Sequence, residues 1–481
     1  MTLAVVNARQ SMDLADRPDM PDHPGRRFLF LQGPISPFFA EVAAGLRACG
    51  HETARINFCL GDRLFWSGPG ATDFTGRLAD WPRFVAAFLD RHRITDLVLI
   101  GEQRPYHKPA IALAKARGIA VTVTDFGYLR PDWVVLERDG MGPESRFPQR
   151  PEAVLALAAQ CPEAALAAQH RDSFATQARW DVLFHLASLL PWPFRHYQSF
   201  LLHPPIPAYL GTALRLLLRG RETRRAGETL AALAAGGAPL FLFAMQMETD
   251  YSIRAYSRFP DMDSALAETF ASFARAAPPG ARLLVKVHPL DPGLKRWSRR
   301  VTRLAAAAGI GDRVHYLGGA LPMEPVIAAC QGVVTVNSTL GVRAIAMGQA
   351  TMALGQAIYA VPGLSWMGPP DAFWTGAPPP DPALAGAFIR ALAACLHVRG
   401  CYYSRPGLDV AVAGAVRRLH LGALNTPLPP ETGATTASPA PACAGAAGRP
   451  HPAPPDPPAP GSAPPPPHSA GHAPDPTPSG C

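Results

Sequence analysis

Short apolar runs alternate with amphipathic segments along the first part of the chain. The runs at Phe28–Leu31, Leu97–Ile100 and Val121–Thr124 are too short for helices and too continuous for exposed strands. Segments such as Trp81–Arg91, with apolar residues three or four apart, lie between the runs. This alternation predicts a parallel, doubly wound sheet for residues 26–150.

The same rhythm returns later, after an interruption. Residues 151–236 are rich in Ala and Leu and lack a clear strand pattern, which predicts a helical segment. Strand-like runs reappear at Pro239–Ala244, Arg282–Val287 and Val333–Val336, and they predict a second sheet within residues 237–424. We therefore expect an α/β protein with two Rossmann-like domains joined by helices.

Both ends of the chain have a different composition. Residues 1–25 are polar, and residues 425–481 consist mainly of Pro, Ala, Gly and Ser. Because such sequences can bury little apolar surface, we expect a disordered leader and a disordered tail.

Charge and cysteine content narrow the partners and the compartment. The formal net charge of +8 favours anionic partners. The sequence has no basic tract interleaved with aromatic residues, so nucleic-acid binding is not predicted. The eight cysteines are scattered, with no CxxC pair, and no secretory signal is evident. The chain contains no stretch of about 18 uncharged apolar residues, so no membrane-spanning helix is predicted. A reduced cytoplasmic setting is expected.

One strand of the second half ends in chemically active residues. Lys286 and His288 are two residues apart at the end of the run, and Pro289 stops it. In an open α/β sheet, ligands bind at this end of the strands. A cation and an imidazole there suit the phosphate of a nucleotide-activated donor.

A polar turn is expected beside them. Asn337, Ser338 and Thr339 follow an apolar run and precede a predicted helix, so they either cap that helix or bind an anion at its N-terminus. Gln246 and Asp250 follow the first strand of the second half, where an amide and a carboxylate can contact a base or ribose.

The first half offers charged residues at strand ends. Asp125 ends a predicted strand and suits a general base or nucleophile, while Arg130 suits a bidentate contact with an acidic sugar. A structural ion pair between these two residues is the alternative. Gln32, Asn57 and Asp62 follow earlier strands and are expected to line the acceptor side.

Familiar metal and nucleotide motifs are weak in this chain. Asp261 and Asp263 have DxD spacing, but they directly precede a helix predicted from Ser264, where Asp is a common cap. We therefore predict no metal site. No GxGxxG or GxxxxGK[ST] motif follows a strand, which argues against a dinucleotide enzyme or a P-loop NTPase.

A basic and aromatic stretch stands out within the helical segment. Residues 179–225 combine tryptophans, many arginines and the run Leu214–Leu218. The stretch is either a helical hairpin packed on the domains or a basic amphipathic surface that contacts anionic lipid.

Taken together, several motifs resemble the capsule polysaccharide biosynthesis family. The string Phe126–Glu137 carries most of the likeness, and Lys286–Pro289, Thr335–Thr339 and Gly355–Tyr359 add to it, over roughly residues 27–400. The resemblance implies a GT-B-like glycosyltransferase that transfers β-Kdo from CMP-β-Kdo to a (lyso)phosphatidylglycerol acceptor. It further implies net retention, no cofactor, a peripheral position at the cytoplasmic membrane surface, and contacts with other capsule assembly proteins.

The layout is also similar to bacterial CMP-sialic acid transferases. In that group a His-Pro motif and a Ser/Thr pair handle CMP, which by resemblance assigns His288, Pro289, Ser338 and Thr339 to the donor.

The resemblance leaves the catalytic carboxylate open. The sialyltransferase pattern has two acidic residues before a Gly, whereas here Asp125 is followed by Phe126. Asp125, Asp132 or Glu137 must then supply the carboxylate. Other interpretations are a CMP-sialic acid transferase or a nucleotide-sugar epimerase on the same fold, or a non-catalytic component of capsule assembly or export.

Overall fold

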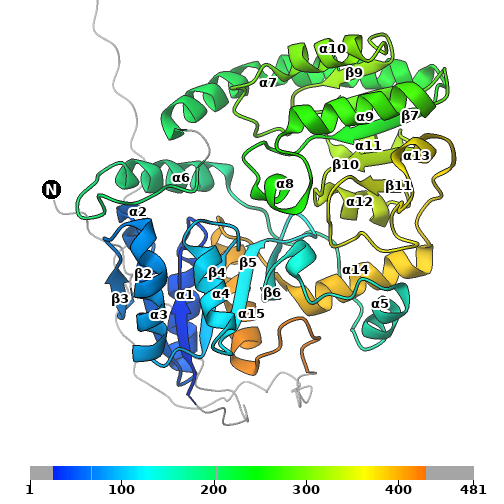
Figure 1. Ribbon diagram of the computed structural model, residues 1–481. Helices are drawn as coiled ribbons and strands as arrows, with labels where there is room; N and C mark the ends of the chain where they lie inside the picture. Colours follow the sequence, from blue (N-terminus) through cyan, green and yellow to red (C-terminus); the bar gives the residue numbers. More distant parts are fainter. Residues whose placement is uncertain (1–24, 67, 202–203, 430–481) are drawn as a thin grey trace, which may run out of the picture. The chain divides into compact units, whose positions relative to one another are not determined.

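Two α/β sheets form the framework of the computed structural model, which describes residues 25–66, 68–201 and 204–429 (Figure 1). The predicted leader, apart from Gly25, and the predicted tail from residue 430 onward lie outside the described residues. All described residues belong to one unit that ends at Pro429.

The first sheet has seven strands in the order β12-β6-β5-β4-β1-β2-β3. The pairings among β1 to β5 are parallel, as predicted, whereas β6 pairs antiparallel with both β5 and β12. The strands are β1 (Arg27–Phe30), β2 (Glu52–Asn57), β3 (Ala71–Asp73), β4 (Asp96–Ile100), β5 (Ala120–Phe126), β6 (Trp133–Arg138) and β12 (His397–Arg399).

The second sheet has five strands, all parallel, in the order β11-β10-β7-β8-β9. Its strands are β7 (Leu240–Ala244), β8 (Arg282–Lys286), β9 (Val314–Leu317), β10 (Gly332–Thr335) and β11 (Ala350–Ala353). The predicted α/β class with two Rossmann-like halves is confirmed.

Fifteen helices and two short 3₁₀ turns surround the sheets within the described residues. The helices are α1 (Phe38–Ala48), α2 (Leu60–Leu64), α3 (Trp81–Arg91), α4 (His107–Lys115), α5 (Pro151–Ala158), α6 (Phe174–Ser188), α7 (Pro205–Ala235), α8 (Tyr251–Tyr256), α9 (Met262–Ala276), α10 (Trp297–Ala307), α11 (Met323–Ala328), α12 (Leu340–Ala346), α13 (Pro370–Gly376), α14 (Pro382–Leu396) and α15 (Arg405–Leu421). The 3₁₀ turns are η1 (Leu78–Asp80) and η2 (Gly142–Glu144). No helix within these ranges combines the length and apolarity that crossing a membrane requires.

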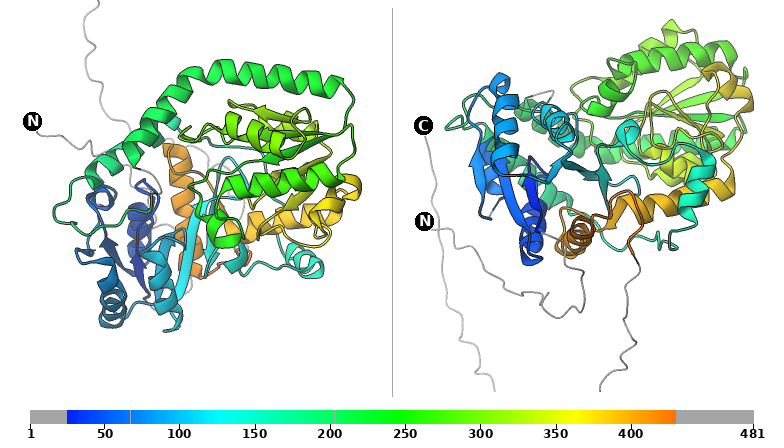
Figure 2. Two further views of the ribbon diagram at one scale, coloured as in Figure 1. Left: turned by 45° about the horizontal axis from the view of Figure 1, so that its top comes forward. Right: turned by 60° about the horizontal axis from the view of Figure 1, so that its bottom comes forward.

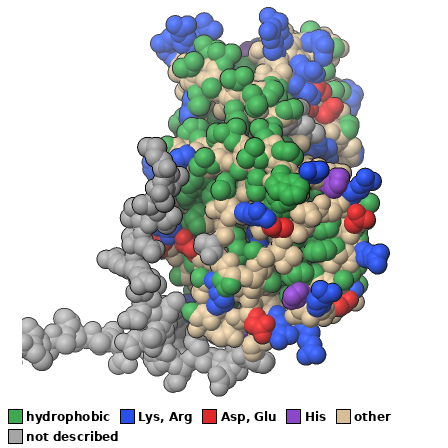
Figure 3. Space-filling view, turned by 90° about the vertical axis from the view of Figure 1, so that its left-hand side faces the viewer, with side chains coloured by type: hydrophobic (Ala, Val, Ile, Leu, Met, Phe, Trp, Pro, Cys, Tyr) green, Lys and Arg blue, Asp and Glu red, His purple; other side chains and the backbone are tan. Residues whose placement is uncertain are grey.

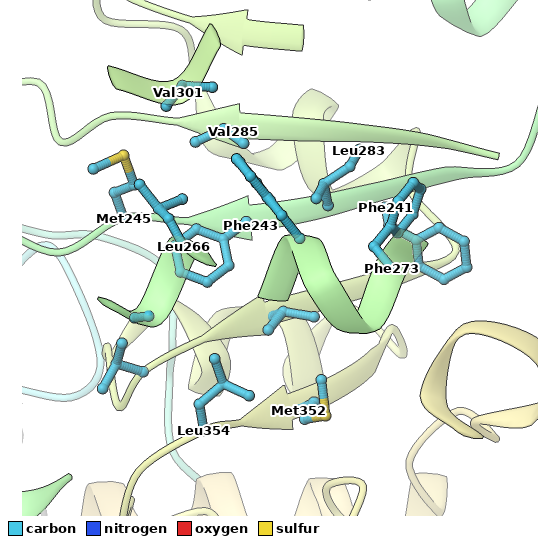
Figure 4. Packing of buried hydrophobic residues seen from close by; sticks show 14 of the residues in the cluster. Phe241, Phe243, Met245, Leu266, Phe273, Leu283, Val285, Val301, Met352 and Leu354 are labelled. Carbon is cyan, nitrogen blue, oxygen red and sulfur yellow. The ribbon is translucent and has the colours of Figure 1, made fainter. Parts of the chain in front are cut away.

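Strand β7 shows why apolar runs become central strands here. Phe241 and Phe243 face a core under α9 and α10, while Leu240 and Leu242 face the opposite core. Figure 4 shows Phe243 packed near Val285 in the first of these cores. A strand covered on both faces must be apolar throughout, and each fully buried large side chain contributes about 1.5–3 kcal/mol.

The end of the described chain returns to the first sheet. Strand β12 pairs with β6, which places Val398 opposite Val134. Helix α15 packs on α1, where Leu408 joins the core of Phe28 and Phe38 (Figure 2). The prediction that the second domain extends to residue 424 is therefore wrong from residue 397 onward, because β12 and α15 pack with the first sheet. A three-residue edge strand has no periodicity from which to assign it.

The segment between the sheets is helical, with α5, α6 and α7 and no strand among its described residues. Helix α5 packs on α14, α6 on α2, and α7 runs along β9. The segment thus contacts elements of both halves.

Candidate functional site

Lys286 is drawn into the protein rather than toward a ligand. Its side chain is buried, and Nζ donates to the carbonyls of Val287 (2.7 Å) and Gly319 (2.9 Å). Burial, aided by the charge of Arg215, lowers the pKa of Lys286 to about 8. The amine therefore fixes the loop after β8, and the structure does not present it as a phosphate contact.

His288 is the polar group that β8 leaves accessible. Its ring is half-buried, and Nδ1 accepts a hydrogen bond from the backbone N–H of Leu290 at 3.2 Å. Burial, followed by the charges of Lys286 and Arg130, lowers the pKa of His288 to about 4. A neutral ring that accepts at Nδ1 carries its proton on Nε2. His288 can therefore donate to an anion across the neutral pH range, and exposed Pro289 follows it.

Gln246 and Asn337 hold each other. The N–H of Asn337 donates to Gln246 Oε1 (2.9 Å), and Gln246 Nε2 donates to Asn337 Oδ1 (2.8 Å). Asn337 Nδ2 also donates to the carbonyl of Ser252 (2.9 Å). Asp250 caps α8 by accepting from the Ser252 N–H, and it accepts from Gln246 as well. These predicted ligands thus lock the ends of β7 and β10 together.

The turn before α12 is held by a local hydrogen bond and is closely packed. Ser338 Oγ accepts from the Leu340 N–H at 3.2 Å, while the Thr339 hydroxyl makes no hydrogen bond with the described residues. A Cβ on Gly341 would lie 2.2 Å from Tyr359 Cζ, so only glycine allows the tyrosine ring this close. Tyr359 in turn donates to the Ser338 carbonyl at 2.9 Å. Ser338 thus bonds to the first residue of α12, whereas Thr339, the N-cap of that helix, makes no capping hydrogen bond with its side chain, so the predicted cap is formed only in part and the Thr339 hydroxyl remains available.

Asp125 ends β5 as a half-buried carboxylate with a fixed orientation. Its Oδ1 accepts from the Phe126 N–H at 2.7 Å. Burial raises the pKa of Asp125, the nearby charges of Arg130 and Arg104 lower it, and Asp250 raises it. No ion pair fixes Asp125 within the described residues, so the alternative of a structural Asp125–Arg130 ion pair is not formed. A carboxylate so placed can act as a base or nucleophile.

Asp132 has a structural role instead. Its Oδ2 accepts from the N–H groups of Gln169 (2.7 Å) and His170 (3.0 Å), and its Oδ1 pairs with Arg399 (3.0 Å). The side chain is fully buried. Because both oxygens are occupied, Asp132 joins β6 to β12 and to the loop before α6.

Glu137 is enclosed in the same way. It is fully buried and accepts a hydrogen bond from the Tyr128 hydroxyl. Burial raises the pKa of Glu137 to about 8, so the carboxyl is largely protonated at neutral pH. It pairs with Val123 inside the sheet, two residues back from Asp125 along β5. Only Asp125 of the three candidates reaches the strand ends.

Three predicted acceptor residues form one buried network around Arg55. Asp62 accepts from Arg55 Nη2 (3.1 Å), from Gln32 Nε2 (3.2 Å) and from the Phe58 N–H (2.9 Å). Arg55 Nε donates to Asn57 Oδ1 at 3.1 Å. A small cavity lies against this network, and its lining includes Gly33, Ser36, Phe39, Arg55, Asp62 and Phe184.

Arg104 was not predicted, although it lies in the loop after β4. Its Nη1 donates to Gln32 Oε1 at 2.9 Å, and its guanidinium lies over the Phe200 ring at 3.9 Å. Neither Arg104 nor Arg130 pairs with a carboxylate in the described part of the chain. Arg130 instead lies over Phe126 at 4.8 Å. Its position just past a strand end could have identified Arg104, since that rule identified Gln32 and Asp62.

Direct hydrogen bonds connect the loop after β4 with α8. Tyr256 donates to Glu102, and Gln103 Nε2 donates to the Tyr256 hydroxyl at 2.9 Å. Burial raises the pKa of Glu102. These bonds bring the strand ends of the first sheet near Asp250 at the start of α8, in agreement with the effect of Asp250 on Asp125.

The DxD pair serves α9 and a local ion-pair cluster. Asp261 accepts from the Ser264 N–H at 2.8 Å as the N-cap, so the predicted cap is confirmed, although the helix starts at Met262. Asp263 pairs with Lys295 (3.0 Å) and Arg300 (2.9 Å). Glu248 also lies within ligand reach of both aspartates and pairs with Lys295. A metal here would have to displace these cations.

Residues 95–403 match the family described as "Capsule polysaccharide biosynthesis protein". The capsule polysaccharide export protein KpsS of Escherichia coli is 28% identical over 395 residues, which cover 79% of this chain and 97% of KpsS. The capsule polysaccharide modification protein LipB of Neisseria meningitidis serogroup B is 28% identical over 391 residues, 78% of this chain and 91% of LipB. A solved structure, the β-Kdo 2,7 transferase of Thermosulfurimonas dismutans KpsC, aligns with a TM-score of 0.38 and 12% identity over 81% of this chain and 98% of that one. Since the family match spans more than half of the chain, the protein belongs to the capsule polysaccharide biosynthesis family.

Proposed function

We propose that this protein is a glycosyltransferase that moves β-Kdo from CMP-β-Kdo to a (lyso)phosphatidylglycerol acceptor at the cytoplasmic face of the inner membrane. The observation that carries the proposal is that Asp125 at the end of β5, Arg104 after β4 and His288 after β8 all lie at strand ends, and that hydrogen bonds from Tyr256 of α8 join the loop after β4 to the second half. Electrostatic coupling links Asp125 to both arginines, and it links Arg130 to His288. Family membership supports a role in building the capsule, with other assembly proteins as further partners.

His288 is proposed to bind the donor phosphate. Its Nε2–H donates to a non-bridging phosphate oxygen, and the Thr339 hydroxyl is a second donor. Because the pKa of His288 is about 4, the ring gives a hydrogen bond rather than a full charge at neutral pH. Gln246 and Asn337 act through the loops that they hold in place.

Arg104 and Arg130 are proposed to hold the carboxylate of the acidic sugar. A guanidinium can bind a carboxylate through two parallel hydrogen bonds. Neither arginine forms an ion pair with another described residue, so both can bind a ligand. Phe200 and Phe126 support their planes through cation–π contacts. The two cations also offset the charge of the departing CMP, so the proposed reaction needs no metal or cofactor.

Asp125 is proposed to be the nucleophile of a double displacement. One carboxylate oxygen attacks the anomeric carbon, the bond to CMP breaks, and CMP leaves with the electron pair. The acceptor hydroxyl then attacks the same carbon, Asp125 leaves as a carboxylate with the electron pair of its bond to that carbon, and the hydroxyl proton passes to solvent water. Two displacements retain the β configuration of the donor. Asp132 and Glu137 take no part, because their oxygens are enclosed.

The test is a donor-specific transfer assay. The protein is incubated with CMP-β-Kdo, CMP-sialic acid or a UDP-sugar and a fluorescent phosphatidylglycerol analogue, and nucleotide release and lipid mobility are followed. We expect CMP release and a more polar lipid with CMP-β-Kdo alone. Turnover of CMP-sialic acid or of a UDP-sugar instead would replace the donor assignment. A protein that neither turns over nor is thermally stabilised by any donor would be a non-catalytic component.

A further inference from the structure

The first half of α7 exposes a continuous stripe of large apolar side chains. The stripe residues recur at spacings that place them on one side of the helix. The helix face opposite them is packed, because Gly211 lies against the Pro292 carbonyl and Arg215 pairs with Asp291 at 3.0 Å. The stripe consists of Ile206 (54% exposed), Leu210 (68%), Leu214 (59%), Leu217 (82%) and Leu218 (42%).

Helix α6 and the segment after it extend this apolar surface. Leu183 and Leu186 are exposed on α6, Leu190 is exposed just after it, and Trp192, at 69%, is among the most exposed large hydrophobic side chains described. The Tyr209 hydroxyl donates to Asp181 Oδ2 at 2.6 Å, which ties α7 to α6. Figure 3 shows hydrophobic side chains gathered on this side of the molecule, with Lys and Arg around them.

Positive charge predominates around the apolar surface, with Asp181 of α6 and exposed Glu228 of α7 among the acidic residues of these helices. Residues 182–221 include no Asp or Glu. Exposed Arg221, Arg224 and Arg225 continue the outer side of α7 beyond the leucines, and none makes an ion pair within the described residues. Arg195 lies over the Trp192 ring at 5.0 Å. An apolar stripe bordered by free arginines fits a surface that is apolar inside and anionic outside.

We infer that the outer side of α6 and α7, named here the α6–α7 face, docks on an anionic phospholipid bilayer. The leucines and Trp192 enter the boundary between headgroups and acyl chains, and the arginines contact lipid phosphates. A second copy of the chain is a poorer occupant, since the unpaired arginines of two copies would be brought together. Binding itself does not depend on the proposed function.

The α6–α7 face is continuous with the candidate site. The segment between the two helices carries Phe200, which lies under the Arg104 guanidinium and accepts a hydrogen bond from the Tyr251 hydroxyl at 2.7 Å. Tyr197 of the same segment accepts from Gln32. Docking would therefore bring the charged strand ends close to the lipid surface. If the proposed acceptor is correct, its headgroup enters from this side.

The test is flotation of the full chain with phosphatidylcholine vesicles, with and without phosphatidylglycerol. We expect binding to the anionic vesicles only. Leu214→Glu with Leu217→Glu should lower partitioning at least about tenfold, because two exposed anchors become anions. Leu155→Glu, on an exposed leucine of α5, is the matched control and should bind like the wild type. Arg221→Ala should cost about fivefold, from roughly 1 kcal/mol per basic residue near the surface.

Two results would overturn the inference. One is equal flotation of the double variant and the wild type. The other is a wild-type dimer in light scattering that the double variant dissolves while vesicle binding stays unchanged, which would make the face a self-association surface. CMP release from CMP-β-Kdo with a detergent-soluble short-chain acceptor separates the two proposals. The double variant should keep that activity, whereas failure of the glycosyltransferase proposal would abolish it in the wild type too.

Discussion

The strand ends of the two sheets differ in how their polar and charged side chains are paired. In the second sheet, at what we call the donor edge (Gln246, His288, Asn337, Ser338, Thr339), most polar groups bond to each other or to the backbone, and the His288 Nε2–H and the Thr339 hydroxyl remain available. In the first sheet, at what we call the charged edge (Asp125, Arg104, Arg130), opposite charges lie near one another without closing into ion pairs.

The difference indicates how work is divided between the edges. A set of neutral donors held by amide pairs is preorganised to bind a phosphate without reorganisation. Partly buried charges without an ion-pair partner destabilise the protein unless a bound ligand supplies the opposite charge. Such groups concentrate at functional sites. We therefore expect substitutions at the charged edge to reduce the chemical step, and substitutions at the donor edge to reduce donor binding.

The largest expected effect is that of Asp125→Asn. An amide cannot attack the anomeric carbon, so kcat should fall about 10³-fold while the melting temperature stays close to that of the wild type. CMP release at saturating donor measures the change. Asp250→Asn is the matched control, since this neighbouring carboxylate caps α8 and accepts from Gln246 but lies off the end of β5, and its kcat should change less than about threefold. An Asp125→Asn enzyme with a tenth or more of wild-type kcat contradicts the nucleophile role.

His288 should show the next largest effect, mainly in binding. Loss of the proposed hydrogen bond from His288 to the anionic donor phosphate in His288→Ala should lower kcat/KM about 10²-fold. His288→Gln places an amide N–H near the position of Nε2 and should recover roughly a tenth of wild-type kcat/KM. No recovery would argue against hydrogen bonding through Nε2.

The pH profile distinguishes a neutral from a charged His288. A pKa lowered to about 4 means that the ring gains its proton only as the pH falls toward 4. Donor affinity measured by calorimetry should therefore show no His288-dependent step between pH 6 and 7, where an ordinary histidine titrates. A step in that range that disappears in His288→Gln contradicts the assignment.

Substitution of the residues that only hold the donor edge in place should have a smaller effect on activity. Gln246→Ala and Asn337→Ala should each raise KM several-fold with kcat nearly unchanged, because both act through loop position. Since the two amides bond to each other, the double variant should be less destabilised than the sum of the single variants, by about 0.5–3 kcal/mol. Additive free energies of unfolding would show that the pair is not coupled.

The sequence identified the sheets and most of the strand ends. Strands such as Leu240–Ala244 carry apolar runs that only a two-sided core requires, and helix α3 has the predicted bounds Trp81–Arg91. It did not identify the return of β12 to β6, because pairing between segments more than 250 residues apart leaves no local pattern.

The site was predictable by position but not by role. Lys286, Asn337 and Gln246 follow strands as expected, yet the structure uses them to bind backbone or each other. A residue type indicates which bonds are possible, whereas the neighbours that satisfy those bonds come from distant parts of the chain. The three candidate carboxylates illustrate this, because only tertiary contacts enclose Asp132 and Glu137 and leave Asp125 accessible.

The smallest expected effect separates Asp125 from Glu137, two carboxyls whose pKa values burial raises. The pKa of Glu137 is about 8 in the folded protein against a usual value of 4.5. As the pH rises from 4.5 to 8, the unfolded chain loses this proton and the folded chain keeps it, so Glu137 lowers stability across that window. Glu137→Gln removes this titration. The difference in melting temperature between the variant and the wild type should therefore be about 2–4 °C more favourable to the variant at pH 8 than at pH 4.5. The value of kcat should be unchanged in Glu137→Gln, because Glu137 lies inside the sheet. A loss of kcat in Glu137→Gln that matches the loss in Asp125→Asn would move the catalytic carboxylate away from the charged edge.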